Sequence, residues 1–155
     1  MVSELRFVDL DVVNKKRLKD LLNKKNIRTH LMGHDEFTDS SLQEWIDGKQ
    51  QVNAQPGCRV QAVLVEGQLA GWCGIQLENG NPEIAIVIDQ KFWGLGRRIF
   101  EQLMNWAEEF KHEFVFIHFL ETRPEYRFLK KISESVYETT LYNHKFMTYK
   151  IPVKR

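Results

Sequence analysis

Long apolar runs and cysteines are both scarce in this chain of 155 residues. The longest apolar stretch, residues 114–120, is interrupted by His118 and is far shorter than the roughly 20 residues that a membrane-spanning helix needs. Cys58 and Cys73 are too few for a disulfide framework and lack the spacing of a zinc site. No signal peptide opens the sequence. These absences argue against a membrane-spanning segment and favour a cytoplasmic protein with reduced cysteines.

A strong charge of one sign is also lacking, since 22 Lys and Arg residues stand against 21 Asp and Glu residues, for a net charge of +1. Neither nucleic acid nor a membrane is therefore the expected partner. Lysines do gather in residues 15–25, but no aromatic residues are interleaved with them, so a solvated helix face is the commoner explanation. An RNA- or ribosome-associated modifier that uses this helix stays open as an alternative.

Linkers and repeats are missing as well. Hydrophobic residues make up 43% and charged residues 28% of the chain, which are ordinary values for a globular protein. The length suits one hydrophobic core. We therefore predict a single domain over residues 1–155.

The most informative stretch covers residues 83–110, where a short β-branched run is followed by two glycines and a helical pattern. Residues 83–88 are bounded by turn formers and predict a buried strand. After Gly94 and Gly96, apolar residues recur at helical spacing at Ile99, Leu103 and Trp106. The glycines thus lie where a strand turns into a helix.

Such a turn can bind a phosphate, because the first amides of a helix have no internal partner and the helix dipole is positive there. Lys91, Arg97 and Arg98 add cations around the same turn. A plain connection remains the alternative for so short a pattern. The dinucleotide fingerprint is excluded because Ile99 replaces its third small residue, and the Walker loop is absent.

The rest of the chain alternates between strand and helix patterns. Residues 4–8 predict a strand, and Asp9 or Asp11 is expected to cap a helix that points Val12, Leu18, Leu21 and Leu22 inward. Ser41 and Glu44 fit the capping box of a second helix. Between these helices, His30 and His34 lie near carboxylates, but helix signals are poor there and no metal is expected.

Residues 59–66 and 68–77 predict an antiparallel hairpin, and residues 113–120 predict a strand that is covered on both faces. A short helix over residues 123–132, with Phe128 and Ile132 inward, precedes a second hairpin of residues 136–142 and 145–151. The predicted order is β-α-α-β-β-β-α-β-α-β-β, an α/β (α+β) fold.

The residues Lys91-Phe92-Trp93-Gly94-Leu95-Gly96, after a strand that opens with Glu83, resemble the acyl-CoA-binding motif of GNAT-type N-acetyltransferases, Gln/Arg-x-x-Gly-x-Gly/Ala. Lys91 takes the Gln/Arg position, and Trp93 stands where arginine is frequent. The order of elements and the chain length extend the resemblance over nearly the whole sequence. It implies a GNAT-like domain whose mixed sheet of about six or seven strands has helices on both faces.

This resemblance implies acetyl-CoA as co-substrate and a primary amine, in a small molecule or at a protein N-terminus, as acceptor. The backbones of Ile86 and Ile88 would pair with the pantetheine arm. Amides of the run from Trp93 to Arg98, which contains Gly94, Leu95, Gly96 and Arg97, would hold the pyrophosphate.

Acetyl transfer needs a neutral amine, and an alkyl amine with a pKa near about 10.4 is almost wholly protonated at pH 7. By the resemblance, Glu83 is the first candidate for the base that removes this proton, often through water. His118 and Glu121 are the alternates, although His118 also suits a hydrogen-bonded core position. Cys73 lies in an apolar strand and is interpreted as core packing.

The last helix departs from the family pattern Asn-x-x-Ala-x-x-Leu-Tyr. Aligning Thr122 with the asparagine puts Leu129 at the tyrosine that protonates the thiolate, and Tyr126, one turn earlier, is the candidate substitute. A non-catalytic acyl-CoA-binding module therefore remains the alternative function. Exposed edge strands of the terminal hairpin would allow a homodimer.

Overall fold

The computed structural model describes residues 4–25, 27, 35–120, 127–141 and 143–153. Seven strands form one sheet in the order β1-β2-β3-β4-β5-β7-β6. The strands are β1 (Leu5–Val8), β2 (Arg59–Val65), β3 (Gln68–Glu78), β4 (Asn81–Ile88), β5 (Phe114–Leu120), β6 (Ser135–Leu141) and β7 (His144–Pro152). The helices are α1 (Lys15–Leu22), α3 (Asp39–Asn53), α4 (Gly96–Glu109) and α5 (Arg127–Ile132), with 3₁₀ turns η1 (Leu10–Val12) and η2 (Gln90–Leu95). The predicted element order is confirmed.

The sheet is mixed, because β4 and β5 are parallel while the other neighbouring strands are antiparallel. Both predicted hairpins are present. The β2–β3 pair has a register shift between Val63 and Leu64, and the β6–β7 pair closes with Leu141 opposite His144. Asn143 in that turn has a φ of 64°, a value that asparagine tolerates better than most residues.

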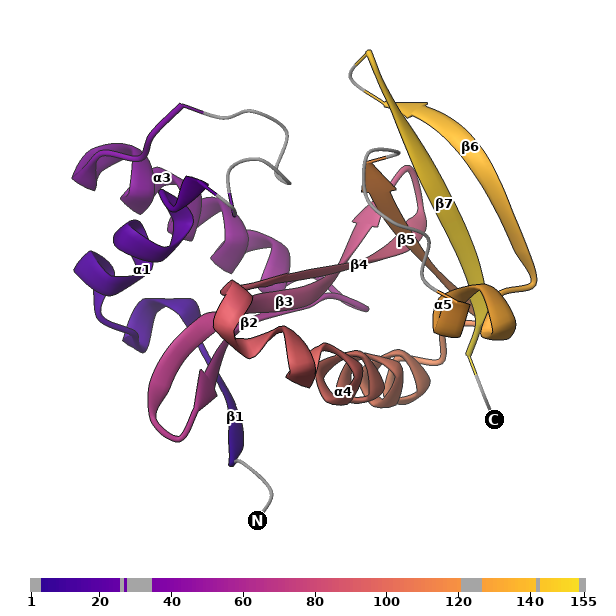
Figure 1. Ribbon diagram of the computed structural model, residues 1–155, viewed down its shortest axis with the longest axis horizontal. Helices are drawn as coiled ribbons and strands as arrows, with labels where there is room; N and C mark the ends of the chain where they lie inside the picture. The colour runs from indigo at the N-terminus through magenta and orange to yellow at the C-terminus, as the bar shows by residue number, and fades with distance from the viewer. Residues whose placement is uncertain (1–3, 26, 28–34, 121–126, 142, 154–155) are drawn as a thin grey trace.

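Helices cover both faces of the sheet, as predicted (Figure 1). One core cluster lies between α4 and the sheet and draws residues from β3, β4, β5 and β7, among them Ile75, Ile84 and Val115. The other cluster lies under α1 and α3 and includes Val60 and Trp72 from β2 and β3. Because successive side chains of a strand point to opposite faces, one strand serves both cores.

The first helix begins later than the sequence predicts. Asn14 is its N-cap, with the Asn14 side chain accepting a hydrogen bond of 3.0 Å from the Arg17 amide. Asp9 precedes η1 instead and makes no capping bond through its side chain. Val12 therefore belongs to η1 and is 67% exposed, so the prediction of an inward Val12 capped by Asp9 or Asp11 is wrong.

The capping box of α3 lies three residues before the predicted one. The Ser41 amide donates to Thr38 Oγ1 at 3.1 Å, and the Thr38 amide donates to Ser41 Oγ at 2.8 Å. Serine thus takes the role that glutamate has in the usual box. Ser41 is inside the helix, so the Ser41–Glu44 box that the sequence predicts is wrong.

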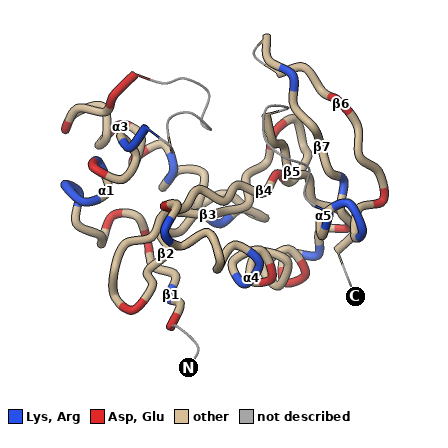
Figure 2. The backbone as a smooth tube through the Cα atoms, viewed as in Figure 1, with Lys and Arg blue, Asp and Glu red and all other residues tan. Residues whose placement is uncertain are grey.

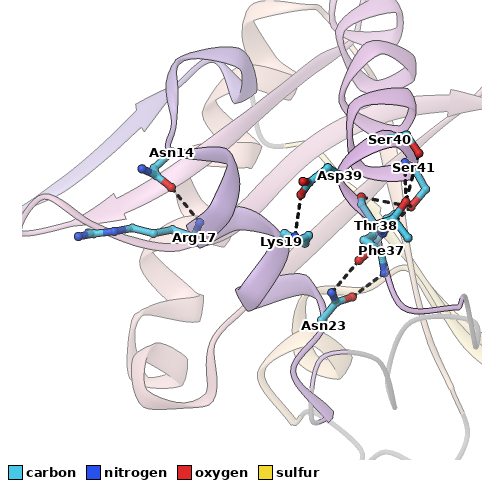
Figure 3. Close-up of polar contacts among 9 residues, drawn as sticks. All are labelled: Asn14, Arg17, Lys19, Asn23, Phe37, Thr38, Asp39, Ser40 and Ser41. Carbon is cyan, nitrogen blue, oxygen red and sulfur yellow. Dashed lines mark hydrogen bonds and ion pairs between the residues drawn. The ribbon is translucent and has the colours of Figure 1, made fainter.

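Polar contacts tie the end of α1 to the start of α3 (Figure 3). The Asn23 amide group donates to the Phe37 carbonyl at 3.1 Å and its oxygen accepts from the Phe37 amide at 2.8 Å. Lys19 Nζ lies 2.6 Å from Asp39 Oδ1. The two helices are thereby joined at their ends as well as through their apolar faces.

The helix predicted over residues 123–132 is described from Arg127 onward, as α5. Leu129 is its buried residue, 7% exposed, while Phe128 and Ile132 are partly buried against the α4 core. Within the part of the chain that the structure describes, no helix is long and apolar enough to cross a membrane.

Gly71 of β3 should be required for stability, because a Cβ added there would lie 2.0 Å from the Val87 carbonyl oxygen of β4. We expect Gly71→Ala to lower the free energy of unfolding by about 1–3 kcal/mol, since backbone must move to admit the methyl group. Gly48→Ala is the matched control. Its Cβ would meet nothing within 4 Å, and alanine inside α3 should stabilise by up to about 1 kcal/mol. Urea unfolding of both variants measures the difference, and equal stability of the two would contradict the packing argument.

Candidate active site

The strands β4 and β5 part soon after they meet. Their parallel ladder consists of one registered pair, Glu83 opposite Phe116. On its other side, β4 pairs with β3 along its whole length, from Asn81 to Ile88. Among the described residues, no strand pairs with the fork-side edge of residues 85–88. We call this opening, beyond Glu83 on β4 and Phe116 on β5, the fork.

On the edge of β4 that faces the fork, every second residue directs its backbone N–H and C=O groups into the opening. The Asp89 amide donates to the Ala70 carbonyl at 2.7 Å, which extends the β3–β4 ladder. Since backbone groups along a strand alternate in direction, the N–H and C=O groups of Ile84, Ile86 and Ile88 point away from β3. This arrangement suits the predicted pairing of Ile86 and Ile88 with an extended pantetheine arm, which stays a prediction.

Glu83 and His118 meet at the base of the fork. Their atoms Oε1 and Nε2 lie 3.4 Å apart, and the two side chains are 27% and 16% exposed. His118 Nδ1 is 2.6 Å from the hydroxyl of Thr148, a residue of β7 that is 1% exposed. Two of the predicted catalytic residues are thus brought together, and one of them is anchored to a third strand.

The direction of the hydrogen bonds fixes how protons are arranged in this pair. The Thr148 hydroxyl donates to Thr139 Oγ1 at 2.8 Å. Its oxygen therefore accepts from a protonated Nδ1 of His118, because a hydroxyl has a single proton to donate. In this tautomer Nε2 carries no proton and faces the Glu83 carboxylate. A proton that reaches the pair can therefore lie between Nε2 and the carboxylate. The pair can hold a proton taken from a substrate.

The turn between β4 and α4 has room for a ligand. A Cβ added at Gly94 or Gly96 would meet nothing within 4 Å, and Gly96 has a φ of −55°, which any residue adopts. The fold itself therefore does not require glycine at either position. The first turn of α4 also has no side-chain cap. These features fit the phosphates of acyl-CoA, which need close approach to helix amides.

The same turn has fewer N–H groups available to bind a phosphate than the sequence predicts. The Gly96 amide already donates to the Trp93 carbonyl, and the Trp93 indole nitrogen donates to the Ile88 carbonyl at 3.3 Å. Arg97 reaches along α4, with Nε 3.7 Å from Glu101 Oε1. Figure 2 shows both signs of charge along α4. The Ile88 carbonyl thus has one of its two lone pairs left for a bound acyl-CoA.

Asp89 is a residue of the site that sequence reasoning missed. It is 6% exposed, one carboxylate oxygen is ion-paired with Lys24 Nζ, and the other accepts from the Lys91 amide at 3.3 Å. Burial tends to raise the pKa of Asp89, but the bonds from Lys24 and the Lys91 amide outweigh it and lower the pKa overall. The available signal was an aspartate directly before a turn, the usual pattern of an N-cap.

Some predicted residues lie outside the described part of the chain, namely Glu121, Thr122, Tyr126, His30 and His34. Across the described ranges, no group of three or more His, Cys, Asp or Glu side chains is arranged to hold a metal ion. Cys73 is fully buried in the α4 core, and burial raises the pKa of its thiol. It therefore has the character of a packing residue.

The Lys24–Asp89 ion pair should make stability depend on pH. Asp89→Asn keeps the cap but loses the charge, so we expect the free energy of unfolding at pH 7 to fall by about 2 kcal/mol. Because the folded-state pKa of Asp89 is lowered, its contribution is present above the unfolded value of about 3.9 and is lost as the pH falls through the folded value. Denaturation at pH 7 and at about pH 3 tests this. Asp47→Asn, an exposed carboxylate on α3, is the control, and a deficit that persists unchanged at low pH would contradict the prediction.

Neither the comparison with protein-family models nor the search of curated proteins finds a match to this sequence. Solved structures do match. A Bordetella pertussis protein classed with the GNAT-family acetyltransferases has 13% identity and a TM-score of 0.76, covering 97% of this chain and 98% of its own.

A spermidine N-acetyltransferase from Vibrio cholerae, crystallised with CoA and spermine, has 14% identity and a TM-score of 0.73, with coverage of 97% and 95%. A Salmonella typhimurium acetyltransferase that modifies the N-terminal serine of ribosomal protein L7/L12 has 15% identity and a TM-score of 0.74, with coverage of 99% and 96%. Over almost its full length, therefore, this chain has the GNAT fold.

Proposed function

We propose that this protein is an N-acetyltransferase that moves an acetyl group from acetyl-CoA directly to a primary amine. The observation that carries the proposal is the Glu83–His118 pair, 3.4 Å apart at the base of the fork and beside the free edge of β4. The named activities of the structural neighbours support it, as does the crystallised CoA of the Vibrio cholerae enzyme. The sequence argument from cysteine usage assigns the reaction to the cytoplasm.

Acetyl-CoA supplies a thioester carbonyl that an amine can attack. Ile86 and Ile88 hold the pantetheine arm through their backbone groups, and the turn of Gly94 and Gly96 admits the pyrophosphate, with Lys91, Trp93, Leu95, Arg97 and Arg98 around it. These contacts position the acyl carbon at the fork. Holding two reactants in line in this way contributes more to the rate than proton transfer alone.

Glu83 takes a proton from the ammonium of the acceptor, directly or through water, and the neutral amine then attacks the thioester carbonyl. The new C–N bond forms as the C–S bond breaks, and the departing sulfur takes up a proton to become the thiol of CoA. His118 stabilises the proton on the pair, because its Nδ1 is fixed by Thr148. Tyr126 remains the sequence-based candidate for the acid that protonates the departing thiolate, and Glu121 remains an alternate to Glu83 as the base.

A non-catalytic acyl-CoA-binding module is the second candidate, and one observation favours it. Leu129, at the position where the family pattern has its tyrosine, is packed into the α4 core and offers no proton. Turnover decides between the two functions.

Binding of acetyl-CoA is the first test, by calorimetric titration of the wild type and of Gly96→Glu. We expect about micromolar affinity for the wild type, and about tenfold or greater weakening in the variant because a carboxylate at this turn repels the pyrophosphate. Gly48→Glu, which also has no atom within 4 Å of the new Cβ, should bind like the wild type. Failure of the wild type to bind would end both the acetyltransferase proposal and the binding-module alternative.

Removal of the base should reduce turnover and leave cofactor binding intact. We expect Glu83→Gln to lower kcat about 10²- to 10⁴-fold, measured as CoA release with an amine panel, with the dissociation constant of acetyl-CoA unchanged. Glu138→Gln changes a carboxylate of β6 whose Oε1 is 4.0 Å from Lys145 Nζ, and it should have no effect. Full activity in Glu83→Gln would remove Glu83 from the mechanism.

A further inference from the structure

Lys49 is a partly buried lysine on α3 that lies over the sheet face of Glu83. Its Nζ donates to Gln76 Oε1 on β3 at 2.7 Å. The same nitrogen is 4.7 Å from the ring centroid of Trp72 and 5.7 Å from that of Trp45. Two aromatic walls and one hydrogen bond therefore hold the ammonium in a defined place against the sheet.

Gln76 connects this lysine to the candidate base. Gln76 and Glu83 are directly opposite in the β3–β4 register. Side chains of such a pair share a face of the sheet, with their Cβ atoms about 4.5–5.5 Å apart. Lys49 and Glu83 are thus separated by a single intervening side chain, on the face where the fork opens.

Lys49 has no close ion-pair partner in the part of the chain that the structure describes. Among the described residues, no carboxylate lies within 4.0 Å of its Nζ. Burial lowers the pKa of the Lys49 ammonium, and the charge of Glu78 opposes this only in part. Trp72, 4% exposed, also has an indole nitrogen without a hydrogen-bond acceptor. The Lys49 ammonium is thus held by a hydrogen bond and two aromatic rings, without a carboxylate of the described residues in ion-pair distance.

We propose that the acceptor substrate carries a carboxylate as well as its amine, and that Lys49 binds this carboxylate while the amine faces Glu83. The inference rests on the acetyltransferase function proposed above and narrows its acceptor class. A substrate carboxylate would give the Lys49 ammonium its counter-charge at the site. A polyamine would bring a second ammonium to Lys49, where like charges repel.

The sharpest test leaves the protein unchanged. CoA release by the wild type is measured with free amino acids, with the carboxamides of the same amino acids, and with spermidine. Each carboxamide lacks the carboxylate of its acid and has a more readily deprotonated amine, so amine basicity alone would favour the carboxamide. We expect kcat/KM to be about ten- to a hundredfold higher for the acid, because the carboxamide loses a hydrogen bond between charged groups.

Variants that change the charge of residue 49 test whether Lys49 causes the preference for the acid. Lys49→Met should remove the preference for the acid over its carboxamide, and Lys49→Glu should reverse it in favour of spermidine. Lys16→Met, which changes an exposed lysine of α1, should keep the wild-type ratio. Calorimetric binding of acetyl-CoA to each variant checks that the cofactor site is intact.

The outcomes separate this inference from the function on which it rests. If the protein binds acetyl-CoA but acetylates carboxamides or polyamines as well as acids, or acetylates no acid, the carboxylate inference is wrong. The acetyltransferase proposal survives if any amine is acetylated. If acetyl-CoA does not bind, the proposed function itself is wrong. An unchanged ratio in Lys49→Met would show that another group recognises the carboxylate.

Discussion

The separation of β4 from β5 is the constraint on which the rest of the site depends. β5 pairs with β7 along its whole length, from Phe114 to Leu120, and β4 pairs in the same way with β3. Between these two well-bonded halves, the one registered pair is Glu83 with Phe116. A sheet that stayed closed here would use the backbone groups of Ile86 and Ile88 in its own ladder. Because it opens, the sheet does not use those groups, although the Ile88 carbonyl accepts a hydrogen bond from the Trp93 indole. A carboxylate and an imidazole from the two halves meet where the opening begins.

The packing at the junction of β4 and β5 differs between the two faces of the sheet. On the α4 face, one core cluster contains residues from both halves, including Ile84 and Ile99 with Val115 and Tyr149. That face is closed by apolar packing, which holds the halves in a fixed relation. On the other face, the cluster under α1 and α3 draws its described strand residues from β1 to β4, as with Val60, Trp72 and Ala85, and none from β5 to β7. Glu83 and His118 lie on this second face, so their partial exposure follows from where the core ends.

The sequence predicted what depends on local pattern. Periodicity and turn residues were enough for the order of strands and helices, and the glycine turn pointed to the fold that the structure has. Caps were predicted less well, because Asp9, Asp11 and Asn14 all suit an N-cap and only packing selects Asn14. The contacts of the site were out of reach for a different reason. Lys24 and Asp89 are 65 residues apart, His118 and Thr148 are 30 apart, and no local rule specifies which of many polar residues meet. Glu83 became the first candidate for the base through the resemblance, whereas the sequence pattern favoured a core position for its neighbour His118.

Asp89 poses an electrostatic problem that Lys24 resolves. A buried carboxylate just before the turn of Gly94 and Gly96 stabilises η2 by accepting from the Lys91 amide, but its charge would oppose any anion that approaches the turn. The ammonium of Lys24, which follows the C-terminal end of α1, neutralises that charge. Helix α1 is joined in turn to α3 by Asn23 and Phe37, and α3 carries Lys49 against the face of Glu83. The helix layer thus contributes cations at two places, one beside Asp89 and one on the sheet face of Glu83. The carboxylate of Glu83 is at the base of the fork, where the proposed mechanism needs a negative charge to receive an ammonium acceptor.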